Sequence, residues 1–130
     1  MKRDLETRED IEQVLQAFYQ QATQDILIGH FFTEVIKLDI QQHIPVIANF
    51  WEAILFGSRT YSKNVMEVHQ HIHQLSAIRK EHLDRWVYLF TQTVDHFYEG
   101  EKANLMKQRG ASIATLMDIK LNYNQINPKQ

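Results

Sequence analysis

Apolar residues recur at intervals of three and four along most of this chain, which is the spacing of one face of an α-helix. The first stripe begins just after Thr7 and Asp10, whose T-x-x-D spacing is typical of a capped helix N-terminus. Tyr19 lies at the edge of this stripe. We predict a helix whose buried face consists of Ile11, Val14, Leu15, Phe18 and Ala22.

The middle of the chain predicts a turn and a second long helix. The apolar segment 26–35 contains Gly29 and is typical of a turn that leads into a short helix. In the next stripe Pro45 fits a helix only in or near its first turn, which puts His43 at the helix mouth. The predicted buried face of this helix consists of Ile40, His43, Ile47, Phe50 and Ile54.

Three further helices are predicted in the C-terminal half. Residues 56–64 have the composition of a loop, and residues 65–75 form a short helix that carries three histidines. Residues 81–98 are strongly periodic, Gly100 ends that helix, and a last helix covers residues 101–121. These two long helices are expected to bury His82, Trp86, Leu89, Phe90, Thr93, Val94, Phe97, Met106, Gly110, Ile113, Ala114 and Met117.

The pattern as a whole indicates one all-α domain. The chain has 130 residues, enough for a single core, and shows no strand period, internal repeat or linker. Gly110 would let the last helix approach a neighbour closely. We therefore expect one domain over residues 1–130, with residues 1–7 and 122–130 frayed.

Composition excludes several classes of protein. A formal charge of -2 and scattered basic residues give no basic patch, so we expect no nucleic-acid partner. The absence of cysteine excludes disulfides, thiolate metal sites and covalent C-x-x-C-H haem attachment. Residues 1–10 are charged and lack the apolar h-region of a signal peptide, and no apolar run is long enough to span a membrane. We expect a soluble, cytoplasmic protein without a membrane partner.

The histidines are the candidate chemistry. On a helix His69 and His73 share a face while His71 points elsewhere, so the triplet offers at most two zinc ligands. The other two interpretations are that the histidines form a solvated helix face, or that one of them acts alone. His43 and His69 lie in separate apolar helices, and two such imidazoles could face one buried iron from opposite sides. Tyr19 and Trp86, each taken alone, are typical core residues.

An ordered set of short motifs brings these residues together. Together the motifs resemble the truncated haemoglobins, most closely group III, over about residues 8–118, and the absence of adjacent glycines agrees with that group. The motifs are F-Y at 18–19, G-x-F-F at 29–32, H-x-P-x-I-x-x-F-W at 43–51, G-x-x-x-Y at 57–61, N-x-M-x-x-H at 64–69, H-x-x-x-W at 82–86 and T-V-D-x-x-x-x-G at 93–100.

The resemblance implies a shortened globin fold, a helical sandwich that encloses one non-covalent b-type haem. It implies that His69 binds the iron, that Phe32 packs on the porphyrin, and that a trio on the opposite side contacts the bound ligand. The trio consists of Tyr19, His43 and Trp86. The other expected haem contacts are Ile47, Phe50, Tyr61, Met66, Arg85 and Phe90.

Two classes of function follow. The first is a haem protein that binds O₂, NO or CO, with nitric oxide detoxification or peroxidase-like chemistry as further activities and an electron-donating reductase as a partner. The second is a non-haem helical protein with a histidine zinc site or a scaffold role. An absorption spectrum would separate them, because only the first has a Soret band.

Overall fold

The computed structural model describes residues 2–57 and 65–123, and within 65–75 the side chains of residues 69 and 71–75. The described parts contain helices and no strand, so the all-α prediction is confirmed. The elements in chain order are α1 (Arg8–Ala22), the π-helix η1 (Phe31–Val35), α2 (Ile40–Phe56), α3 (Val65–Leu75), α4 (Lys80–Phe97), α5 (Glu101–Asp118) and the π-helix η2 (Ile119–Tyr123).

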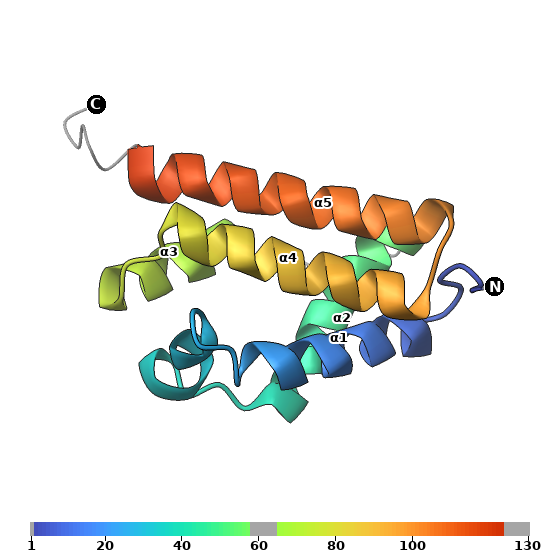
Figure 1. Cartoon of the computed structure of the whole chain (residues 1–130), viewed down its shortest axis with the longest axis horizontal. Coiled ribbons are helices and arrows are strands. Elements are labelled where there is room, and N and C mark those ends of the chain that lie inside the picture. The colour runs from blue at the N-terminus through green and yellow to red at the C-terminus, as the bar shows by residue number, and fades with distance from the viewer. Residues whose placement is uncertain (1, 58–64, 124–130) are drawn as a thin grey trace.

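The four long helices form two pairs, α1 with α2 and α4 with α5, around one core (Figure 1). The helices α4 and α5 run antiparallel, side by side, while α2 crosses behind α1. The pairs pack on one another through α1 against α4 and α2 against α5. The short helix α3 stands at one end and packs mainly against η1.

The N-terminal segment is held in place, contrary to the expectation that residues 1–7 fray. Leu5 is only 2% exposed and belongs to the core. The Asp4 carboxylate accepts hydrogen bonds of 2.9 Å from the backbone N–H groups of Lys102 and Ala103, and so caps the start of α5. A Cβ at Gly100 would lie 2.5 Å from the Asp4 carboxyl carbon, so this corner requires glycine.

The start of α1 agrees with the sequence prediction. Thr7 Oγ1 accepts a hydrogen bond from the Asp10 N–H, and the Asp10 carboxylate accepts one from the Thr7 N–H. This reciprocal capping box satisfies N–H groups that the first helical turn leaves unpaired. All of the predicted core residues of α1 are buried, and Tyr19 is buried with them.

The burial of α2 corrects the sequence prediction. The fully buried stripe is Ile44, Ala48, Trp51 and Leu55. The stripe predicted from the apolar spacing, His43 and the residues in register with it, is only half-buried and packs at the edge of the core. Both stripes are apolar and lie one residue apart, so periodicity alone cannot choose between them.

Two details of helix ends also differ from the prediction. Pro45 lies inside α2 beyond its first turn, and its carbonyl accepts a hydrogen bond of 2.9 Å from Arg8 Nη2. The short helix predicted after Gly29 is a π-helix, in which the Ile36 N–H bonds to the Phe31 carbonyl. The α2 helix ends at Gly57, whose φ of 77° is the left-handed conformation that favours glycine.

The close contact predicted at Gly110 is present. A Cβ there would lie 3.0 Å from two ring carbons of Phe90, so α5 approaches α4 as closely as a glycine allows. Leu83, which the predicted stripe omitted, is buried, whereas Trp86 and Ile113 are half-buried at the edge of the core. Within the described residues no helix is long and apolar enough to cross a membrane.

Candidate functional site

The structure brings Tyr19 and His43 into direct contact. Tyr19 Oη and His43 Nε2 are 2.9 Å apart and share a hydrogen bond between α1 and the first turn of α2. Tyr19 is 7% exposed, and burial raises the pKa of its phenol. The phenol therefore stays protonated at neutral pH and keeps an O–H to donate.

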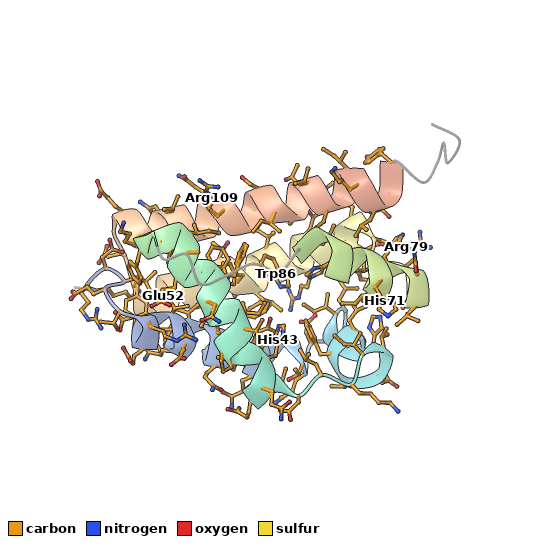
Figure 2. The ribbon with its side chains drawn as sticks, turned by 180° about the vertical axis from the view of Figure 1, so that it is seen from behind. His43, Glu52, His71, Arg79, Trp86 and Arg109 are labelled. Atoms are coloured by element: carbon orange, nitrogen blue, oxygen red, sulfur yellow. The ribbon has the colours of Figure 1, made fainter. Side chains whose placement is uncertain are left out.

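Aromatic rings surround this pair. The Phe32 ring meets the Tyr19 ring edge-on with centroids 5.7 Å apart. Phe18, the neighbour of Tyr19 on α1, contacts Trp86 on α4 at 5.5 Å. Figure 2 shows Trp86 in the space between α2 and α3, and His43 on α2. The trio predicted from the sequence thus comes from three helices and is connected through Phe18.

Half-buried apolar side chains at the edge of the core include members of η1, α2, α3 and α4. They include Phe32, Ile47, Phe50, Ile54, Ile72 and Trp86. Phe32, Ile47 and Phe50 were predicted as haem contacts.

Phe90 is buried, as its place in the apolar stripe of α4 predicted. It is 1% exposed, and its ring stacks with both Trp51 and Trp86, at centroid distances of 5.3 and 4.9 Å. A ring enclosed in this way supports Trp86 from within the core instead of lining an apolar surface. Trp51 was not among the predicted core or haem-contact residues, and it entered the sequence analysis only as the last residue of the motif H-x-P-x-I-x-x-F-W.

The three histidines of α3 differ in their surroundings. His71 is exposed, whereas His69 and His73 are half-buried. His73 Nδ1 accepts a hydrogen bond of 2.9 Å from the Ile78 N–H, so the neutral ring carries its proton on Nε2. That state leaves His73 no lone pair for zinc. The described residues also contain no group of three or more metal-ligating side chains, so the zinc alternative has no support there.

Arg85 was predicted to contact the haem, but the structure pairs it with Asp25. Its Nε and Nη2 atoms lie 2.9 and 2.8 Å from Asp25 Oδ1, and this guanidinium lowers the pKa of the Asp25 carboxyl. The Arg85 guanidinium also lies over the Tyr88 ring. Arg85 and Asp25 both border a surface cavity of about 520 Å³ beside the end of α1. Tyr61 and the side chain of Met66 lie outside the described residues.

The arrangement defines a small helical sandwich of the globin type, and comparisons with known proteins agree. No family model matches the chain. It is 26% identical over 118 residues to a group 3 truncated haemoglobin of Campylobacter jejuni, covering 88% of this chain and 91% of that protein. A crystal structure of the group III truncated haemoglobin from Campylobacter jejuni superposes with a TM-score of 0.81, at 26% identity, covering 95% of this chain and 98% of that one. Over nearly its whole length the chain is therefore similar, in sequence and in fold, to group III truncated haemoglobins.

The likeness to these haemoglobins supports a haem cofactor and a globin-type role in ligand binding. The described residues fit such a group. A globin haem needs a histidine for its iron, apolar surface for its ring and a polar group near the bound ligand. The chain offers His69 on α3, the half-buried apolar set around Phe32 and Phe50, and the Tyr19–His43 pair on different helices.

Proposed function

We propose that this protein binds b-type haem without covalent attachment and takes up diatomic ligands such as O₂, NO and CO at the haem iron. The observation that carries the proposal is the buried Tyr19 phenol, hydrogen-bonded to His43 at 2.9 Å beside an apolar surface. A buried hydroxyl next to half-buried aromatic rings suits a small polar ligand held out of water.

We assign the iron to His69. It is half-buried on α3, and the N-x-M-x-x-H spacing of residues 64–69 supports it. His73 has its Nδ1 occupied by the Ile78 N–H, and His71 is exposed, so neither competes well for the role. Phe32, Ile47 and Phe50 supply apolar surface for the porphyrin, and we extend the same role to Tyr61 and Met66 from the sequence.

When bound, haem supplies the open iron coordination position at which a diatomic ligand binds. The residues of the chain set the affinity. Trp86 donates from its indole N–H. Tyr19 donates its single O–H to the ligand when His43 carries its proton on Nε2 and donates to the phenol oxygen, which also fixes the ring. A hydrogen bond to a partly charged ligand contributes about 1.5 to 3 kcal/mol, or roughly ten- to a hundred-fold in affinity.

We further propose turnover of nitric oxide or peroxide, with an electron-donating reductase as partner. A donor-rich pocket that holds a ligand with negative charge also stabilises charge that develops during its reaction. Stopped-flow mixing of the oxygenated protein with nitric oxide, with and without a reductant, tests this directly. Rapid nitrate formation that becomes catalytic when the reductant is present supports the proposal. Nitric oxide that is not consumed after mixing argues against it.

The haem assignment is tested on the purified protein. We expect a Soret band and one haem per chain, and we expect His69→Ala to lose stable haem binding. His71→Ala is the matched control, because it removes an exposed imidazole from the same helix and should keep the spectrum. A colourless, folded wild-type protein would overturn the haem proposal. A normal spectrum in His69→Ala would overturn the choice of ligand.

A further inference from the structure

Two neighbouring backbone amides between α3 and α4 each donate to a histidine ring. The Ile78 N–H donates to His73 Nδ1, and the Arg79 N–H donates to His82 Nδ1, both at 2.9 Å. His73 lies near the end of α3 and His82 in the first turn of α4. The α3–α4 connection, residues 76–79, is therefore held from both sides by imidazoles.

Both bonds require a particular form of the ring. An imidazole accepts at Nδ1 only when it is neutral and carries its proton on Nε2. Burial lowers the pKa of His82 and so favours the neutral ring. The charged and titratable groups that face His82 are Glu81, which raises its pKa, and His30 and Arg79, which lower it. The Phe31 ring also lies against His82, with centroids 5.0 Å apart.

The connection matters because it joins α3 to the packed long helices. The four long helices pack on one another, whereas α3 packs mainly against η1. Ile78 is 6% exposed, so its side chain is anchored in the core while its amide holds His73. His82 makes the same bond to the residue before its helix that Asp10 makes in the capping box of α1. Together the two rings join the end of α3 to the fixed start of α4.

We propose that His73 and His82 are positioning residues, whose Nδ1 atoms clamp the α3–α4 connection and so fix the orientation of α3 and of the His69 imidazole. The part that concerns His69 rests on the proposed function. The clamp explains why α3 carries a second half-buried histidine, four residues after His69, that is not needed as an iron ligand. It acts on the haem only through the helix.

The test compares variants that keep and remove the acceptor. His73→Asn and His82→Asn retain an oxygen that can accept from the same amide, whereas His73→Leu and His82→Leu remove it. His71→Asn is the control, because His71 is exposed on the same helix. Amide hydrogen exchange at residues 78 and 79 should quicken about five- to tenfold in the matching Leu variant, as expected for the loss of one hydrogen bond. The Asn variants should restore slow exchange.

Imidazole ¹⁵N NMR of the wild-type protein keeps the clamp testable if a Leu variant fails to fold. Both rings should carry the proton on Nε2, and a proton on Nδ1 in either ring would overturn the clamp at that residue. In the haem-loaded, reduced protein the iron–histidine stretching band should shift in the Leu variants and return in the Asn variants. A band unchanged despite faster exchange would overturn the positioning role. A wild-type protein without haem would overturn the proposed function and the role assigned toward His69. The amide exchange rates and the histidine tautomers would still show whether His73 and His82 clamp the α3–α4 connection.

Discussion

Single side chains set the chemistry of the proposed ligand site. Tyr19, His43 and Trp86 come from three helices, and each is at least half-buried, so water competes weakly with them for a small ligand. Tyr19 and His43 also bond to each other at 2.9 Å. A substitution at Tyr19 or His43 therefore removes one polar group from the site and also changes the orientation of the other residue.

Replacing Tyr19 with Phe should accelerate O₂ release by roughly ten- to a hundred-fold. The substitution removes one oxygen atom and little volume, so the fold and haem content should persist. The lost donor is worth about 1.5 to 3 kcal/mol toward a partly charged ligand. Stopped-flow ligand replacement measures the rate, and CO, which carries less negative charge, should respond less. Wild-type O₂ release with an unaltered ratio of O₂ to CO affinity would contradict the role of Tyr19.

Replacing Trp86 with Phe should leave a folded protein with altered O₂ dissociation. Phenylalanine keeps most of the apolar bulk that packs on Phe18 and Phe90 but has no N–H donor. Circular dichroism checks the fold and laser photolysis the ligand kinetics. Leu105→Ile, on a half-buried apolar residue of α5, serves as a packing control. A folded variant with unchanged kinetics would reduce Trp86 to a core residue.

At the scale of elements, one glycine sets the spacing of α4 and α5. Gly110 faces Phe90, and Phe90 is itself stacked with Trp51 and Trp86, so the ring has little freedom to move away. A change in the spacing of α4 and α5 would therefore displace Phe90 and, through it, Trp86.

Replacing Gly110 with Ala should destabilise the fold. The new methyl would lie 3.0 Å from two Phe90 ring carbons, and overpacking costs about 1 to 3 kcal/mol. Alanine also gains about 0.5 to 1 kcal/mol in helix propensity, which offsets only part of that cost. Thermal unfolding should show a lower midpoint than wild type, whereas Ser112→Ala, at an exposed position of α5, should not. An unchanged or raised midpoint for Gly110→Ala would contradict the prediction, because it would show that the Phe90 ring can move away from the new methyl group.

At the scale of the whole molecule, the N-terminal segment ties α1 to the corner between α4 and α5. Arg3 makes two hydrogen bonds to the Asp10 carboxylate, at 2.8 and 2.7 Å, and Tyr98 donates to the same carboxylate. The hydrogen bonds from Arg3 hold the pKa of Asp10 well below its usual value of 3.8, although burial opposes this. The Tyr98 pKa rises to about 12, chiefly through burial and also through its bond to Asp10.

Acid should remove the stability that Asp10 contributes. The pKa of Asp10 in the folded state lies below 3.8, so the folded state binds fewer protons than the unfolded state in acid. The stability that Asp10 contributes is therefore complete above about pH 4 and is lost as the pH falls through the pKa of Asp10 in the folded state. Asp10→Asn should lower the free energy of unfolding by about 1 to 2 kcal/mol at pH 7, since Arg3 is half-exposed and its bonds are screened. Urea unfolding at several pH values measures the difference. A gap that stays constant below pH 3 would contradict the assignment.

The sequence by itself determined the helices, the capping box at Thr7 and the order of motifs that resembles the truncated haemoglobins. These features are local: they depend on the spacing of apolar residues, on the chemistry of caps and glycines, and on residue order, all of which are written along the chain. The sequence also singled out Tyr19, His43 and Trp86, whose roles toward a ligand remain predictions.

Only the tertiary structure decided which of two apolar stripes of α2 is buried and which partner each polar side chain takes. Arg85 pairs with Asp25, sixty positions away, and Asp4 caps a helix that begins at Glu101. Phe90 is enclosed by Trp51 and Trp86, and His73 and His82 hold the amides that join α3 to α4. Such choices depend on which surfaces meet when the helices pack, and periodicity along one helix carries no information about its neighbour.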